Sequence, residues 1–175
     1  TDQLNALNSE QIAALSTAQV SSLTTAQVAG LETADIQALT TDQFKVLSSA
    51  QLGAMNTEQL AAIETDDIRQ ISTAAIRGIT SDNIDAFSSD QVKALGTAQV
   101  QSLATQQLKG LSTEQMAAMD TEDLRALTTG QIRALATDQL NALTTEQFAA
   151  PTTIQIASLT TQQVAGLETA DLQAM

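Results

Sequence analysis

The stretch TTAQVAGL at residues 24–31 is one copy of an eight-residue unit that recurs along the whole chain without insertion or deletion. Counted from the second Thr of this stretch, Thr25, the first position of every octad is Ser or Thr. The fourth position is always large and apolar, and the seventh is Leu, Ile, Met or Phe except at Pro151. The third position is usually Gln, and the sixth is usually small. A strict short period of this kind indicates an array of stacked repeats.

The spacing of the apolar residues alternates between three and five, which would place them on opposite faces of a β-strand. A continuous α-helix turns by about 100° per residue, so its apolar stripe would drift by about 80° per octad. A helix that restarts in every octad avoids both problems. We therefore expect an all-α solenoid, or superhelix, of about 22 single short helices, with the fourth and seventh positions lining a continuous core. The small sixth position predicts close approach between neighbouring helices.

The charged residues support separate short helices. The fifth position holds all seven basic residues: Lys45, Arg69, Arg77, Lys93, Lys109, Arg125 and Arg133. Nineteen of the twenty acidic residues stand at the eighth, second or third position. Acids near the start of a helix and bases near its end interact favourably with the helix dipole. Because this polarity resets in every octad, it indicates one helix per octad.

Each octad also contains a signal for a helix start. A Ser or Thr at the first position can accept a hydrogen bond from an N–H two or three residues later. Alternatively, the eighth position is the cap and the third-position Gln completes a capping box. The unbroken Ser/Thr column favours the first position. This interpretation makes the following residues structural helix caps: Thr17, Thr25, Thr33, Thr41, Thr97, Thr105 and Thr113.

Pro151 agrees with interrupted helices, because Pro is tolerated just past a helix end and disrupts a helix interior. Ile154 is the one large apolar residue at a second position. We expect its side chain to fill the space that a Leu at position 151 would occupy.

The composition excludes several kinds of chemistry. The chain has no Cys, His, Trp or Tyr and a net charge of −13. It therefore lacks thiolates, the commonest general base and metal ligand, and stacking platforms for nucleic-acid bases. The negative charge repels phosphate backbones and anionic membranes, and no apolar run approaches the roughly 20 residues of a membrane helix. We expect no enzyme activity, no cofactor, no nucleic-acid partner and no membrane insertion.

Acidic pairs are the one recurrent chemical irregularity. Wherever the third position is Asp, the preceding eighth position is also acidic, and the pairs are Glu32 with Asp35, Glu64 with Asp67, Asp120 with Asp123 and Glu168 with Asp171. These carboxylates are candidate Ca²⁺ ligands, but a pair supplies too few of the six to eight oxygens that Ca²⁺ takes. Both carboxylates can instead serve the helix N-terminus as cap and dipole partner.

The chain is expected to be one continuous octapeptide array over residues 1–175, cut from a longer array. Octads 65–88 are the least regular, and a face on which their residues act together would indicate a binding scaffold. Alanine substitutions at Arg69, Arg77 and Asp85 address that hypothesis. The evenly spaced Thr column also suggests an ice-binding face, although capping explains it without further assumption.

The segments TTAQVAGL, STAQVSSL and TTDQFKVL resemble octapeptide arrays in very large secreted or surface-exposed bacterial proteins, often described as adhesin-like or haem-utilisation-like. The resemblance covers the whole chain and implies an extracellular or cell-surface structural setting. It carries over no catalytic or binding residue.

These observations predict a non-enzymatic structural segment, which is a stalk, spacer or fibre-forming array. Its expected partners are other copies of itself or adjoining repeats. The alternatives are an α-solenoid scaffold that binds a protein partner and, third, an ice-binding array.

Overall fold

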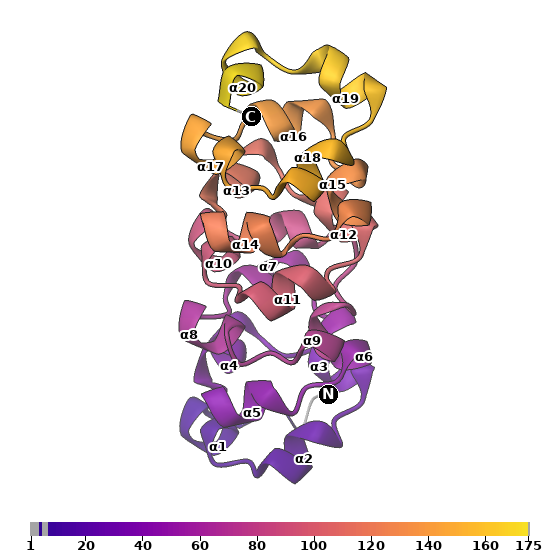
Figure 1. Ribbon diagram of the computed structural model, residues 1–175. Coiled ribbons are helices and arrows are strands. Elements are labelled where there is room, and N and C mark those ends of the chain that lie inside the picture. Colours follow the sequence, from indigo (N-terminus) through magenta and orange to yellow (C-terminus); the bar gives the residue numbers. More distant parts are fainter. Residues whose placement is uncertain (1–3, 5–6, 175) are drawn as a thin grey trace.

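The computed structural model describes Leu4 and residues 7–174, and it shows an elongated stack of short helices (Figure 1). Within these residues, twenty α-helices and one 3₁₀-helix follow one another, with one element in each octad. Most of the first octad lies outside the described residues. The prediction of an all-α solenoid built from single short helices is confirmed.

The helices have the following bounds: α1 (Ser9–Ala13), α2 (Thr17–Ser21), α3 (Thr25–Ala29), α4 (Thr33–Ala38), α5 (Thr41–Lys45), α6 (Ser49–Gly53), α7 (Thr57–Ala61), α8 (Thr65–Ile68), α9 (Thr73–Ile76), η1 (Ile84–Ala86), α10 (Ser89–Lys93), α11 (Thr97–Ser102), α12 (Thr105–Gly110), α13 (Thr113–Ala118), α14 (Thr121–Ala126), α15 (Thr129–Ala134), α16 (Thr137–Asn141), α17 (Thr145–Ala149), α18 (Thr153–Ala157), α19 (Thr161–Gly166) and α20 (Thr169–Ala174).

The helices begin with a capping box whose cap is the eighth position. Before α2, Ser16 is extended, its hydroxyl accepts a hydrogen bond from the Gln19 N–H at 3.2 Å, and Gln19 Oε1 accepts one from the Ser16 N–H at 2.8 Å. The eighth and third positions are three residues apart, which is the spacing of a capping box. Three residues after a first-position Thr stands the apolar fourth residue, which cannot return a hydrogen bond.

The assignment of first-position caps is therefore wrong, and the alternative frame is correct. The residues concerned are the first helical residues of their helices and not the caps: Thr17, Thr25, Thr33, Thr41, Thr97, Thr105 and Thr113.

The helices end without a left-handed residue, because no described residue has a positive φ. The seventh residue is extended where it follows the helix directly, as at Leu111 (φ −70°, ψ 136°). The eighth residue is extended as well, as at Ser112 (ψ 167°), because it caps the next helix. Each cap thus ends one helix and starts another.

Helices three apart in the sequence pack together, as in the pairs α1·α4, α2·α5 and α3·α6, and this relation continues along the chain. Because the contacts extend into the octad after that as well (see below), one superhelical turn contains between three and four octads. In Figure 1 the turns rise from α1 and α2 at one end to α19 and α20 at the other.

The core is one continuous column inside this stack. Every fourth-position side chain from Ile12 to Phe148 is at most 5% exposed, and the seventh positions from Leu31 to Leu143 are buried as well. The prediction that these two positions line the core is confirmed. Burial of this size, repeated in every octad, is what a helix far too short to be stable alone requires.

The sixth position lies against the backbone of the first position 29 residues earlier. A Cβ built on Gly78 would come within 1.9 Å of the Ser49 carbonyl oxygen, and one built on Gly110 within 2.2 Å of that of Ser81. The prediction of close approach at the small sixth position is confirmed, since a side chain at either Gly would displace a backbone.

Pro151 leaves a defect in the core. A small apolar cavity of about 20 Å³ adjoins it, lined among others by Leu140, Phe148 and Leu159. Ile154 does not fill this space, because its side chain is 73% exposed. The expectation for Ile154 is wrong because a second-position residue points away from the core in this register.

Candidate functional site: the glutamine column

The third-position Gln makes the most connected polar contact of the molecule. Gln99 Oε1 accepts a hydrogen bond from the Gly96 N–H at 2.8 Å and so caps α11. Its Nε2 donates to the carbonyl oxygens of Ile68 and Ile71, both at 2.7 Å. These acceptors lie 31 and 28 residues earlier in the chain. One amide therefore starts its own helix and joins two superhelical turns.

The same contact recurs along the stack. Both carbonyl oxygens, 31 and 28 residues earlier, accept from the Nε2 atoms of Gln43, Gln51, Gln59, Gln91, Gln99, Gln107, Gln115, Gln131, Gln139, Gln155 and Gln163. Gln147 makes the variant contact, to Ala117 and Met119. We call this set of residues, with Gln147, the glutamine column.

The acceptors of a column residue are the fourth and seventh residues of the octad four earlier. All members of the column are buried. A buried amide that lacked partners would cost several kcal/mol, on the order of 2 to 7. Here the donor group and the amide oxygen are both used, so the column removes that cost and also satisfies carbonyls that would otherwise face the apolar core.

Sequence reasoning assigned the third-position Gln to capping and missed its second role. A signal for that role was present, because Glu never occurs at this position. Glu is as suitable as Gln for a capping box. Its exclusion indicates that the side chain must also donate a hydrogen bond, which a carboxylate cannot do.

The four acidic pairs interrupt this pattern at the start of α4, α8, α14 and α20. Asp35 keeps the capping contact, since its Oδ2 accepts from the Glu32 N–H at 2.9 Å. An ionised Asp cannot donate to the two carbonyls that a column Gln would serve. Asp171 shows the consequence, because its buried Oδ2 has no hydrogen-bond partner.

Burial changes the acidity of two of these residues. It is the largest cause that raises the pKa of Asp123, to about 6, and the charges of Asp120 and Glu122 add to it. Burial also raises the pKa of Asp67, where a hydrogen bond with Thr41 acts in the opposite direction and the charges of Glu64 and Asp66 add to the increase. Both carboxyl groups stand where the fold requires a neutral donor.

The structure separates the two members of each acidic pair. The third-position residues Asp35, Asp67, Asp123 and Asp171 are buried, and the eighth-position residues Glu32, Glu64, Asp120 and Glu168 are exposed. In the part of the chain that is described, no three Asp, Glu, His or Cys side chains are grouped to hold a metal ion. Ca²⁺ binding by these pairs stays a prediction.

Two depressions mark the outer surface. One has a volume of about 400 Å³ and combines Arg69 and Lys93 with Asp120, Glu122 and Asp123. Lys93 Nζ lies 3.9 Å from Asp120 Oδ1 there. The other, of about 600 Å³, is lined by small and hydroxyl side chains with a single charged residue, Arg77. Neither contains a nucleophile paired with a base.

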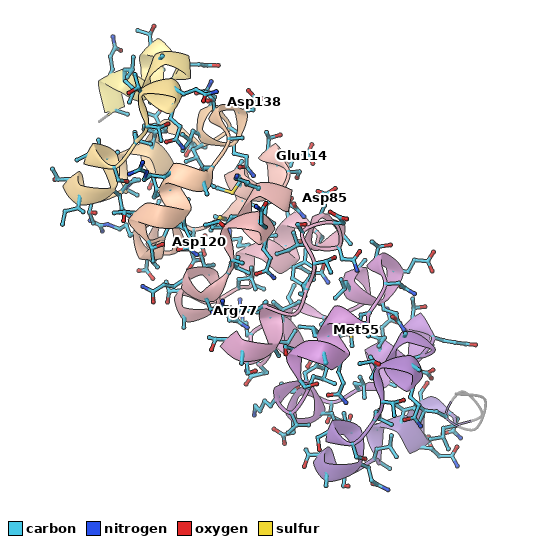
Figure 2. All side chains as sticks on the ribbon, turned by 90° about the vertical axis from the view of Figure 1, so that its right-hand side faces the viewer. Met55, Arg77, Asp85, Glu114, Asp120 and Asp138 are labelled. Carbon is cyan, nitrogen blue, oxygen red and sulfur yellow. The ribbon has the colours of Figure 1, made fainter. Side chains whose placement is uncertain are left out.

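The irregular octads do not form one face. Arg69, Arg77 and Asp85 belong to three successive octads, which follow one another around a superhelical turn. Figure 2 shows Arg77 and Asp85 on opposite flanks of the rod. The same winding carries the first-position hydroxyls around the rod, so they do not gather on a flat face.

The described helices are all too short and too polar to span a membrane. The sequence model of a known repeat family, the ALTTAQ repeat, matches five overlapping segments, residues 1–32, 28–63, 60–97, 92–121 and 116–153. The first of these segments spans four octads, the same interval that separates a column Gln from its acceptors. No curated protein matches the chain.

Proposed function

The chain belongs to the ALTTAQ repeat family, and we propose that it is a non-enzymatic structural segment that acts as a stiff stalk or spacer. The observation that carries this proposal is the glutamine column. Each turn rests on the turn before it through the same buried amide contacts. An array held in this way gains length in proportion to its number of octads and keeps its stiffness.

We place this rod in a secreted or cell-surface protein of bacterial origin. The support is the resemblance of its octads to arrays in such proteins, together with a composition free of Cys and a net charge of −13 that favours solubility. The same resemblance suggests that adjoining repeats of the same chain are its immediate neighbours.

The test is small-angle X-ray scattering on the chain and on two deletion variants. Removing residues 97–128 takes out four whole octads and rejoins Gly96 to Thr129, so every remaining Gln keeps an acceptor octad. We expect a rod that is shorter by about one turn and melts at a similar temperature.

The matched control removes residues 97–124, which takes out three and a half octads and breaks the frame. It should lose most of its thermal stability. A scattering profile of a compact or flexible particle for the intact chain, or equal tolerance of both deletions, would contradict a stiff rod.

A binding scaffold remains the second candidate because Arg69 and Lys93 share one depression with Asp120. A variant with both basic residues replaced by Ala should keep its melting temperature. If it also lost a protein partner that the unaltered chain captures, this surface would be a binding site, and the spacer role alone would be insufficient.

A further inference from the structure

The two ends of the rod leave different groups without partners. At the N-terminal end, Gln11 and Gln19 are exposed and Gln27 is half-buried, although the column residues after them are buried. Their Oε1 atoms cap their own helices, as at Gln19, where Oε1 lies 2.8 Å from the Ser16 nitrogen. Their Nε2 groups have no acceptor among the described residues. This end therefore presents hydrogen-bond donors.

The C-terminal end presents the matching acceptors. The last carbonyls that a column amide reaches are those of Ile132 and Leu135, which accept from Gln163. Beyond Asp171, the described chain has no third-position residue to serve the carbonyls of Ile156, Leu159, Val164 and Leu167.

The apolar side chains are complementary in the same way. Val164 and Leu172 are 43% and 42% exposed, whereas fourth-position side chains inside the rod are at most 5% exposed. At the N-terminal end the fourth positions are buried, and the seventh-position residues Leu7, Leu15 and Leu23 are half-buried instead. One end lacks the cover that the other end provides.

We propose that the C-terminal end binds the N-terminal end of a second copy of this chain, head to tail, so that the glutamine column continues across the junction. The octad frame determines the pairing. Gln11 of one copy donates to the carbonyls of Ile156 and Leu159 of the other, and Gln19 donates to those of Val164 and Leu167. Because the two faces differ, the contact does not close on itself, and it produces filaments.

Charge sets the conditions for this contact, which rests on the structural role proposed above. The first five and the last five octads contain no Lys or Arg, and both contain Asp and Glu. The two ends therefore repel each other electrostatically. Salt screens this repulsion, so association should strengthen as ionic strength rises.

The experiment is sedimentation velocity of the chain over a wide range of protein concentration and salt. We expect a series of species that are multiples of the single rod and lengthen with salt. Gln19→Glu keeps the capping box but places a carboxylate against the partner's carbonyls. Val164→Glu places a charge in the apolar part of the junction. Each variant should associate at least about tenfold more weakly, since an unpaired buried charge costs more than 1.4 kcal/mol.

A mixture of the two variants separates head-to-tail association from other modes. Gln19→Glu has an intact C-terminal end and Val164→Glu an intact N-terminal end, so together they should form pairs and stop there. The control is Ile154→Glu, which alters the most exposed apolar side chain at a second position, outside the contact between turns. It should associate like the unaltered chain.

Two results would overturn the inference. Loss of association in Ile154→Glu but not in Val164→Glu would show that the rods contact side by side. A chain that remains single at every concentration and salt has no such contact between its ends. If scattering still showed a stiff rod in that case, the spacer role would stand without self-assembly.

Discussion

Residues 65–88 and 89–112 are adjacent stretches of three octads that attach to the preceding turn in different ways. In the second stretch Gln91, Gln99 and Gln107 each donate to two carbonyls. In the first stretch the same positions hold Asp67, Ala75 and Asn83, of which Asn83 alone donates, to the Met55 carbonyl at 3.1 Å.

The core is unaffected by this difference. The apolar side chains of Ile68 and Ile71 are 0% and 2% exposed, and those of Val92 and Leu95 are 0% and 3% exposed. The helices do differ, because α8 and α9 have four residues and η1 is a 3₁₀-helix, whereas α10, α11 and α12 have five or six residues. The apolar residues therefore set the path of the chain, and the amides extend the helices and satisfy the carbonyls between turns.

The largest effect is expected when the second stretch is made to lack an amide. Gln107→Leu leaves the Ile76 and Ile79 carbonyls and the Ala104 N–H without their partner. We expect a loss of about 2 to 4 kcal/mol in the free energy of unfolding, measured by urea denaturation. The adjacent exposed Gln106 is the control, and Gln106→Leu should change stability by less than about 0.5 kcal/mol. Equal losses in both variants would refute the role of the column.

The next effect concerns the close approach in the first stretch. Gly78→Ala places a methyl group 1.9 Å from the Ser49 carbonyl oxygen, so a backbone must shift. A destabilisation of about 1 to 3 kcal/mol is expected. Gly130 is a helical Gly with no atom closer than 3.9 Å to the added Cβ, so Gly130→Ala should stabilise the chain by about 0.5 to 1 kcal/mol. Thermal denaturation of both variants checks the opposite signs.

A third change converts an acidic interruption into a member of the column. The pKa of Asp123 is about 6 in the folded chain and about 4 in an unfolded one, so the folded state binds the proton more tightly. Stability from this group is present below about pH 4 and falls as the pH rises through 6. We expect Asp123→Gln to be more stable than the unaltered chain at neutral pH by about 1 to 3 kcal/mol, with a smaller gain at pH 4.

The charged groups around Asp123 are Asp120 and Glu122 nearby in the sequence, and Arg69 and Lys93 across the depression. Asp123→Asn is the control, because it removes the charge but is too short to reproduce both amide contacts. It should gain less than Asp123→Gln. A gain for Asp123→Gln that does not depend on pH would show that the carboxyl group is not the cause.

The smallest effect comes from extending the Asn of the first stretch. Asn83 already donates to the Met55 carbonyl, and Gln in the same register also reaches the carbonyl of Leu52, 31 residues earlier. Asn83→Gln should stabilise the chain by about 0.5 to 1 kcal/mol. Amide hydrogen exchange over residues 84–86 should slow in this variant if the capping box turns η1 into an α-helix. Unchanged exchange would mean that the 3₁₀ geometry has another cause.

The local pattern was sufficient to predict much of this molecule. The fourth and seventh positions identified the core, because burial repeats with the octad, and Gly78 and Gly110 were recognised as positions of close approach. The cap was placed one residue late, because both Ser/Thr-rich positions can accept a hydrogen bond and the unbroken column favoured the wrong one. Ile154 was expected to be buried, but its position faces solvent.

The sequence by itself determined that each octad forms one helix, with two apolar columns and a polarity that resets every eight residues. These properties depend on hydrogen bonds and burial patterns within a few neighbouring residues. The tertiary structure alone decided how many octads complete a turn and which groups the third-position Gln and Asp side chains meet. Their partners are backbone carbonyls 28 and 31 residues away, and every residue carries a carbonyl, so no side-chain pattern could identify them.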